Sequence, residues 1–199
     1  MIRERTRAHP FTALLLALLS FGACGKDDTP PVAPPEPPPP ASAAPSWDML
    51  ATGENFKAVC SFDDGSAVVV GDGGTVMRFD GAAWHGMRTP TSSILRGVWG
   101  SSSTDVFAVG DRGTILHFDG DSWTRQESRV DRDLWGVWGT APDDVYAVGR
   151  SGMTLRYDGS RWNRTDLGTG GGLLGVAGSS GGAVFAVGGP ARVHRFLRP

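Results

Sequence analysis

Short apolar runs separated by glycine-containing turns fill most of the sequence after residue 55. Residues 105–110 read DVFAVG and residues 115–118 read ILHF, with the turn Gly-Asp-Arg-Gly between the two runs. The second run is followed by Asp-Gly, a pair typical of tight hairpin turns in which a residue needs a positive φ. This pattern predicts short antiparallel strands joined by tight turns.

The pattern repeats with a fixed period. Four glycines, each ending an apolar run, are spaced 39 residues apart: Gly71, Gly110, Gly149 and Gly188. Each copy contains four strand-like pieces, which in the second copy read RGVWG, DVFAVG, TILHFD and SWTRQE. Four short antiparallel strands in about 40 residues form one blade of a β-propeller, whereas the coils of a solenoid are shorter and lack hairpin turns.

The fourth copy has no piece that corresponds to SWTRQE. Residues 46–52 read SWDMLAT and begin with the same Ser-Trp pair, so we expect them to supply the fourth strand of the last blade. The predicted fold class is therefore all-β: a β-propeller of four blades, each of four antiparallel strands, over residues 46–199. The alternative is half of an eight-bladed ring built by two chains.

One set of aligned positions consists of very small residues on the first, innermost strand of each blade. Such residues allow close approach of neighbouring backbones. We therefore expect a tight centre without a wide channel. The set is Ala58, Gly97, Gly136 and Gly175.

The first 45 residues differ from the repeats in composition. A basic start precedes the apolar segment 11–21, which is shorter than the roughly 20 residues that span a bilayer. We interpret residues 1–23 as a signal peptide. Residues 24–45 are rich in Pro and predict a disordered, extended tether.

The end of the signal peptide reads FGAC and resembles the lipobox of bacterial lipoproteins, although Phe21 stands where Leu is usual. The resemblance implies lipidation of Cys24. It also implies an exported protein that is lipid-anchored in the bacterial envelope, with the outer membrane as the default. An ordinary secretory signal with an incidental Cys is the alternative.

Charge and cysteine content exclude some classes of function. The formal net charge of −2 shows no basic excess of the kind that nucleic-acid binders carry. Cys60 is the one cysteine in the predicted propeller, so no disulfide framework can form within it. Because Cys60 lies in an apolar strand, we expect a buried and unreactive thiol.

The sequence contains no nucleophile–base constellation, metal-ligand cluster or phosphate loop, so we predict a non-enzymatic protein without a cofactor or metal. The turn after the second strand holds Asp72 and Asp111 in two blades but Arg150 and Gly189 in the others. A symmetric metal ring would need a carboxylate from every blade. The aspartates before the hairpin glycines, Asp80, Asp119 and Asp158, are interpreted as turn formers.

Positions that break the repeat are the better candidates for binding, because packing does not require them. Lys57, Arg96, Trp135 and Leu174 are equivalent but differ in type at the start of the innermost strand. A Trp with two cations suits a carbohydrate or an acidic peptide loop, and ordinary surface variation is the alternative. With the adjacent turns, the candidate ligand-binding residues at one mouth of the ring are Lys57, Arg96, Trp135, Asp72, Asp111 and Arg150.

Two further sets recur in the blades. One place on the third strand is always basic or histidine, which suits either a cation ring for an anionic ligand or, as we favour, pairing with an Asp of a neighbouring blade. A Trp begins the outermost strand, and its repetition favours packing between blades over sugar stacking. The sets are Arg78, His117, Arg156 and Arg195, and Trp84, Trp123 and Trp162.

The repeats WGSSSTDVFAVGDRGTILHFDGDSW and WGTAPDDVYAVGRSGMTLRYDGSRW resemble those of secreted and lipid-anchored propeller proteins of myxobacteria and related bacteria. These are grouped with bacterial-neuraminidase (BNR, Asp-box) and photosystem-II-assembly-factor-like propellers. The resemblance covers residues 56 to 199 and implies a propeller. The Asp-box itself is incomplete, since VGDRGTIL lacks its Ser and its Trp.

The resemblance does not favour a glycan-active hydrolase. A sialidase would imply an Arg triad and a Tyr nucleophile, but Tyr146 and Tyr157, the two tyrosines, replace Phe at repeat positions. We therefore predict a lipid-anchored propeller of the cell envelope that acts as a protein-interaction or assembly scaffold. A carbohydrate- or polysaccharide-binding module is the alternative. The expected partners are the membrane, through the lipid, and an envelope protein or polysaccharide, but no nucleic acid.

Overall fold

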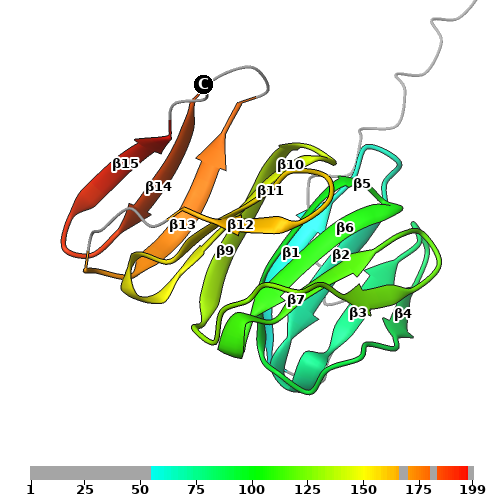
Figure 1. Cartoon of the computed structure of the whole chain (residues 1–199). Coiled ribbons are helices and arrows are strands. Elements are labelled where there is room, and N and C mark those ends of the chain that lie inside the picture. The colour runs from blue at the N-terminus through cyan, green and yellow to red at the C-terminus, as the bar shows by residue number, and fades with distance from the viewer. Residues whose placement is uncertain (1–54, 166–169, 180–182, 197–199) are drawn as a thin grey trace, which may run out of the picture. The chain divides into compact units, whose positions relative to one another are not determined.

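The computed structural model describes residues 55–165, 170–179 and 183–196, which belong to one compact unit, Trp47–Pro199. The described residues form four antiparallel sheets, each continuous in sequence (Figure 1). Blade 1 contains β1 (Phe56–Ser61), β2 (Ala67–Gly71), β3 (Val76–Phe79) and β4 (Trp84–Met87); blade 2 contains β5 (Leu95–Ser102), β6 (Asp105–Gly110), β7 (Ile115–Phe118) and β8 (Trp123–Arg125). Blade 3 contains β9 (Leu134–Ala141), β10 (Asp144–Gly149), β11 (Thr154–Tyr157) and β12 (Trp162–Arg164); blade 4 contains β13 (Leu173–Gly178), β14 (Val184–Gly188) and β15 (Arg192–Phe196).

Within each sheet the strands pair in chain order, so each 39-residue copy is one blade of a propeller. The predicted all-β fold of four antiparallel blades is confirmed. Blade 4 has three strands among the described residues. The predicted closing strand at 46–52 lies outside the described residues, as do the signal peptide and the tether.

The repeated glycine at the end of the second strand is required by space. Gly110 has an extended backbone, with φ −166°, so any residue could adopt its conformation. A Cβ added there, however, would lie 2.0 Å from the carbonyl oxygen of Ile94, just before β5. Gly149 and Gly188 make the same close approach, so the repeated glycine marks where the ends of two paired strands touch.

The hairpin turns between the third and fourth strands form as the sequence predicts. In blade 2, Oδ1 of Asp119 accepts hydrogen bonds from the backbone N–H groups of Asp121 at 3.0 Å and Ser122 at 2.9 Å. Gly120 between them has φ +99°, which glycine adopts without steric cost. Asp80 and Asp158 make the equivalent bonds in blades 1 and 3, which confirms their role as turn formers.

Neighbouring blades contact each other through their innermost strands, β1 with β5, β5 with β9 and β9 with β13. At the centre, a Cβ added to Gly97 would lie 3.2 Å from the carbonyl oxygen of Trp135, and one added to Gly136 would lie 3.4 Å from Cα of Gly175. The predicted close approach of backbones at the small innermost residues is therefore confirmed for blades 2 to 4.

The outer strands pack between blades through aromatic side chains. Phe107 of blade 2 lies with its ring centroid 5.4 Å from that of Tyr157 and 5.8 Å, edge to face, from that of Trp162 in blade 3. Trp123 and Trp162 are both buried, and Trp84 of the first blade is half-buried. The predicted packing of the repeated Trp between blades is confirmed, because the Trp is buried in blades 2 and 3, which have a preceding blade, and only half-buried in blade 1, which has none in the described chain.

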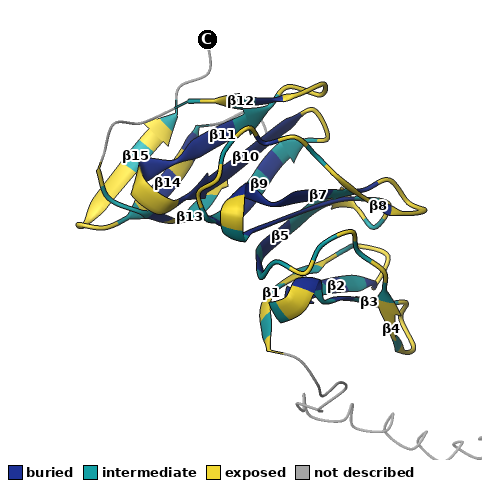
Figure 2. Cartoon of the chain, turned by 60° about the horizontal axis from the view of Figure 1, so that its bottom comes forward, coloured by how far each residue is buried: buried dark blue, intermediate teal, exposed yellow. Residues whose placement is uncertain are grey.

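The two end blades keep one sheet face uncovered. Figures 1 and 2 show blade 1 and blade 4 at opposite ends of the row of sheets, and Figure 2 shows exposed residues on β14 and β15. Each end face carries large apolar side chains: Val59 on blade 1, and Leu174, Phe185, Val187 and Val193 on blade 4.

Two further observations concern the sequence predictions. Cys60 on β1 is half-buried, and burial raises the pKa of its thiol, which disfavours the reactive thiolate. In the part of the chain that the structure describes, no helix has the length and apolar character needed to cross a membrane.

Candidate functional site: a charged rim beside two arginine-lined clefts

The predicted binding residues do gather at one end of the blades. Lys57, Arg96 and Trp135 are each the second residue of an innermost strand, and Leu174 holds the same place in β13. The second strand of each blade ends beside them, because the registers pair Leu95 with Gly110 and Leu134 with Gly149. The three short 3-10 turns that follow, η1 (Asp72–Gly74), η2 (Asp111–Gly113) and η3 (Arg150–Gly152), therefore lie at the same end.

Hydrogen bonds hold these turns in place. In blade 2, the Asp111 N–H donates to the carbonyl of Ile94 at 3.0 Å, and the Thr114 N–H donates to the carbonyl of Asp111 at 3.1 Å. The Arg112 N–H donates to Oδ1 of Asp133, in the connection to blade 3, at 3.0 Å. The turn is thus tied both to its own blade and to the next one.

Each of the three turns carries an ion pair. Nζ of Lys57 lies 3.3 Å from Oδ1 of Asp72 in blade 1. Arg96 binds Asp111 through Nε and also through Nη2, at 3.1 Å from Oδ2, in blade 2. Nη1 of Arg150 lies 3.9 Å from Oδ2 of Asp133 in blade 3. We call these six residues the charged rim: Lys57, Asp72, Arg96, Asp111, Asp133 and Arg150.

The side chains of the rim support each other's charged forms. A hydrogen bond from the Asn55 amide, and then the ammonium of Lys57, hold the pKa of Asp72 below its usual range. The carboxylate of Asp111 raises the pKa of Arg96. Each cation of the rim is therefore paired with an anion, and the longest of these ion pairs is that of Arg150 with Asp133.

Trp135 has a different setting. Its side chain is half-buried, and a Cβ added to Gly172 would lie 2.4 Å from its ring, so the ring packs against the backbone of the segment that enters blade 4. One side of the indole is therefore occupied by protein, which leaves less of it for a ligand.

Sequence reasoning missed two residues: Asn55, which donates a hydrogen bond to Asp72, and Asp133, which is part of the rim. The available signal was the same one that identified the other candidates: both stand just before an innermost strand, where the other copies have Ile94 and Gly172. Residues of four different types at one repeat position indicate that packing does not fix the side chain there.

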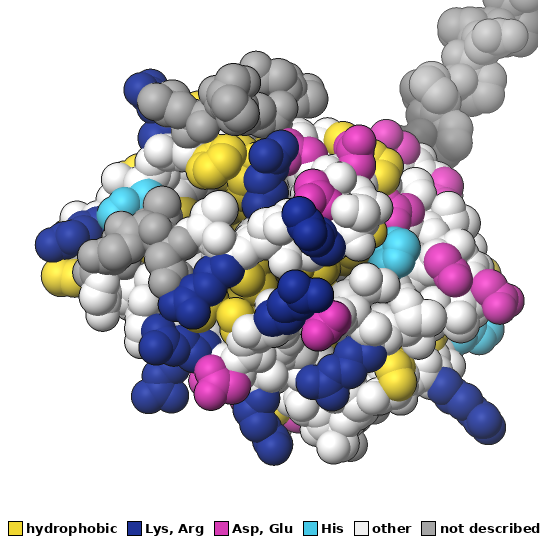
Figure 3. Space-filling view, in the orientation of Figure 1, with side chains coloured by type: hydrophobic (Ala, Val, Ile, Leu, Met, Phe, Trp, Pro, Cys, Tyr) yellow, Lys and Arg dark blue, Asp and Glu magenta, His cyan; other side chains and the backbone are white. Residues whose placement is uncertain are grey.

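Two open clefts adjoin the blade 3 part of the rim. One, of about 270 Å³, is lined by Asp131, Arg132, Asp133, Arg150 and Ser151; the other, of about 420 Å³, is lined by Arg129, Val130, Asp131, Arg132, Met153 and Arg164. Lys and Arg side chains gather over the middle and lower left of the molecular face in Figure 3. The sequence did offer a signal, because the connection ESRVDRD carries alternating charges where the preceding copy has RTPTSSI.

In blades 2 and 3 the basic residue of the third strand pairs with an acid of its own blade, so the structural role is supported there, but the predicted partner on a neighbouring blade is wrong for these two residues. Nε2 of His117 lies 2.6 Å from Oδ1 of Asp105, and Nε of Arg156 lies 2.8 Å from Oδ1 of Asp144. Each acid starts the second strand of the same sheet, where the pairing register brings it beside the third strand. Blades 1 and 4 have Ser66 and Ala183 in place of the acid.

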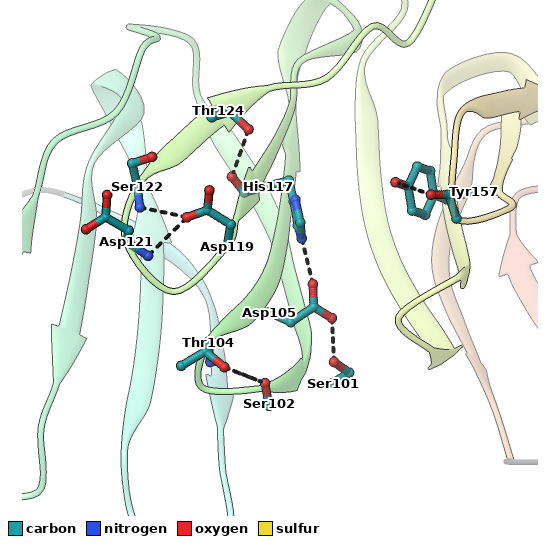
Figure 4. A network of polar contacts seen from close by, with 11 residues as sticks. Ser101, Ser102, Thr104, Asp105, His117, Asp119, Asp121, Ser122, Thr124 and Tyr157 are labelled. Atoms are coloured by element: carbon teal, nitrogen blue, oxygen red, sulfur yellow. Dashed lines mark hydrogen bonds and ion pairs between the residues drawn. The ribbon is translucent and has the colours of Figure 1, made fainter.

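Figure 4 shows the blade 2 network around Asp105. Ser101 donates its hydroxyl hydrogen to one carboxylate oxygen of Asp105, and His117 contacts the other. The acid therefore stands between the hydroxyl and the imidazole. The hydroxyl of Ser101 therefore contacts the carboxylate and not the imidazole, which is not the order of a Ser-His-Asp triad, where the hydroxyl contacts the imidazole.

In the part of the chain described by the structure, no three His, Cys, Asp or Glu side chains are grouped so that they could hold a metal ion. Neither tyrosine lies at the mouth of the ring, where a catalytic nucleophile would be reached by a substrate. Tyr146 is fully buried between blades 3 and 4, and Tyr157 packs on Phe107.

Comparisons with known proteins bear on the fold. No family model matches the chain, and no match is found among curated proteins. Similar solved structures include YCF48 from Cyanidioschyzon merolae (16% identity, TM-score 0.59, 71% of this chain and 50% of that chain) and YCF48 bound to a D1 peptide (18%, 0.55, 73% and 54%). Another is Sqt1 of Chaetomium thermophilum bound to the N-terminus of ribosomal protein L10 (20%, 0.58, 72% and 43%). This chain thus spans about half the length of these propellers and shares their fold.

Proposed function

We propose that this protein is a non-enzymatic interaction scaffold, held in the bacterial envelope by a lipid on Cys24, that binds an acidic peptide segment of a partner protein. The segment binds along the charged rim and the two clefts beside it. The observation that carries this proposal is the set of arginines around the clefts. The side chain of Arg150 is 66% exposed and lies 3.9 Å from its nearest carboxylate, so it is available to a second one.

The geometry suits a peptide better than a compact ligand. The clefts are shallow and run along the connection between blades 2 and 3, and their cations come from separate segments: Arg129 and Arg132 from the connection, Arg150 from η3 and Arg164 from β12. Separate guanidinium groups can each take one carboxylate of an extended chain with charge-assisted hydrogen bonds. The solved propellers that are similar in fold include one bound to a D1 peptide and one bound to the N-terminus of ribosomal protein L10, which supports a peptide partner.

Binding can be tested with an array of synthetic peptides that differ in Asp and Glu content, and with cross-linking in the intact envelope. We expect the wild-type chain to prefer acidic peptides and Arg150→Ala and Arg132→Ala each to weaken binding about tenfold, since one charge-assisted bond contributes about 1.5 kcal/mol. The matched control is Arg125→Ala, an exposed arginine on β8 that lines neither cleft. Equal retention of acidic peptides by all four proteins would refute the proposed site.

Anchoring needs its own test. We expect metabolic labelling with palmitate to mark the wild-type chain, and Cys24→Ala to abolish the label and release the protein from the membrane fraction. Labelling that survives the substitution would refute lipidation at Cys24 without bearing on the peptide site.

Carbohydrate binding is the second candidate function, and the observation in its favour is the half-buried Trp135, at the same end of blade 3 as Arg150. A glycan array compares the two candidates directly. Glycan retention that is lost in Trp135→Ala and kept in Arg132→Ala would favour the carbohydrate over the acidic peptide.

A further inference from the structure

The uncovered faces at the two ends of the row are equivalent to faces that are buried inside it. Phe185 of blade 4 is 43% exposed, whereas its equivalents Phe107 and Tyr146 in blades 2 and 3 are each 1% exposed. On blade 1, Val59 is 65% exposed, whereas its equivalent Val98 in blade 2 is 9% exposed. The side chains are of the same kind at each position, so the difference comes from the presence or absence of a neighbouring blade.

The two uncovered faces are also different from each other. Inside the row, the side of a blade that carries Phe107 always packs against the side of the next blade that carries Val137 and Tyr157. The uncovered face of blade 4 is equivalent to the side that carries Phe107 (a Phe107-type face), and the uncovered face of blade 1 is equivalent to the side that carries Val137 (a Val137-type face). The uncovered face of blade 4 therefore has the residues that pack against a face such as that of blade 1.

The remaining positions at the two ends complete the match. By repeat position, Phe185 corresponds to Phe107, and Phe79 and Trp84 of blade 1 correspond to Tyr157 and Trp162. Phe79 and Trp84 are half-buried and contact each other with ring centroids 5.4 Å apart, as Tyr157 and Trp162 do at 5.3 Å. Phe79 and Trp84 on blade 1 therefore already have the arrangement that contacts the ring of Phe107 inside the row.

The curvature of the row indicates which blade 1 is within reach of blade 4. The chain covers 43% to 54% of the length of the similar solved propellers, with TM-scores of 0.55 to 0.59. Its four blades therefore follow the path of about half of such a ring. A ring of only four blades would need a much larger turn from blade to blade. The innermost Gly175 agrees with this path, because a Cβ added there would meet only Val187 of its own blade.

We propose that the uncovered face of blade 4 packs on the uncovered face of blade 1 of a second copy, and the reverse, so that two copies form one ring of eight blades. The interface repeats the contact between blades 2 and 3 twice, with Phe185 against Phe79 and Trp84 of the other copy. The contact between unlike faces closes because two half-rings bring both pairs of faces together at once.

The test uses the full chain, prepared with two different C-terminal tags, co-expressed and solubilised in detergent. We expect one tagged copy to capture the other, and native mass spectrometry to give a mass of two chains. Val59→Glu or Phe185→Glu, each placed in both copies, should lower capture at least tenfold, because either change puts a charge into both joints. Both positions are exposed in the single chain, so folding should survive, which the circular dichroism spectrum checks.

A mixture provides the sharper measurement. When one copy carries Val59→Glu and the other carries Phe185→Glu, one of the two joints is free of substitutions, so capture should return, whereas two copies of the same variant should not associate. Thr124→Glu, at an exposed position of β8, is the matched control and should capture as the wild type does. Copies that merely share a detergent micelle would be captured whichever variant they carry, so the loss of capture expected with Val59→Glu and Phe185→Glu separates that case from a joint between blades.

Three results would overturn the proposal. A mass of one chain for the wild type would mean that the two end faces do not bind a second copy. Loss of capture with Phe185→Glu but not with Val59→Glu would mean that blade 4 meets blade 4. Capture that neither substitution affects would place the contact elsewhere on the molecule.

Discussion

Substituting Gly110 with Ala tests the reasoning that space, and not backbone conformation, fixes the repeated glycine. The added Cβ would lie 2.0 Å from the carbonyl oxygen of Ile94, so the two paired strand ends must move apart by roughly 1 Å. Overpacking of this kind costs about 1–3 kcal/mol. The shift also strains the hydrogen bond from the Asp111 N–H to the same carbonyl, 3.0 Å long, which contributes about 0.5–1.5 kcal/mol.

We therefore expect Gly110→Ala to lower the free energy of unfolding by about 2–4 kcal/mol. Measured by urea titration of tryptophan fluorescence, this corresponds to a midpoint lower by about 1–2 M for a domain of this size, at an unchanged slope. Gly86→Ala on the exposed strand β4 is the matched control, because nothing lies within 4 Å of its added Cβ, and it should change stability by less than about 0.5 kcal/mol. A midpoint for Gly110→Ala equal to that of the control would refute the steric explanation.

Three further predictions concern titration, a side-chain pair and the closing strand. The backbone N–H groups of Ala83 and Ala82, with a hydrogen bond from His85, hold the pKa of Asp80 at about 2. Because the pKa is lower in the folded chain, the stabilisation is complete above the unfolded value of about 4 and is lost as the pH falls toward 2; Asp80→Asn, which keeps the acceptor oxygen, should flatten this part of a melting-temperature profile. Arg156→Leu and Asp144→Asn should show a coupling free energy of about 1 kcal/mol in a double-mutant cycle by urea unfolding, and strictly additive effects would contradict the pairing. Deletion of residues 46–52 should lower the melting temperature if these residues complete the last blade, and an unchanged melting temperature would exclude that role.

The fold could be predicted from the sequence because its signals are local and repeated. Asp119-Gly120 needs only its own hairpin to form a turn, and Gly110 marks a contact between strands that are neighbours in sequence. Four copies of such signals in register left few alternatives to a propeller blade.

The pairing of charges was only partly predictable. Arg96 and Asp111 were both placed at one mouth, but their ion pair depends on the distance between a strand start and a turn, which periodicity does not give. The Asp105–His117 contact could have been found by writing out the register, since Phe107 pairs with His117 and Asp105 lies two residues away on the same face. The preference for a neighbouring blade ignored this geometry.

Burial at the ends of the row could not be read from residue type. Phe107 and Phe185 occupy the same place in the same strand pattern, and their exposure differs because one has a following blade and the other does not. A periodic sequence describes the unit and its contacts but not how many units meet.

The uncovered faces of the first and last blades differ, so the row of blades has a direction and copies join head to tail. Units joined head to tail by a constant rotation have two outcomes. If the rotations add up to a full turn, the ring closes and growth stops; if they do not, the units continue into a helical filament. The rotation between blades is set at the innermost strands, where Gly97 and Gly136 allow the backbones to touch. A larger residue at either glycine would therefore change more than local packing, because a small error in rotation, repeated at every blade, decides between a finite particle and a fibre.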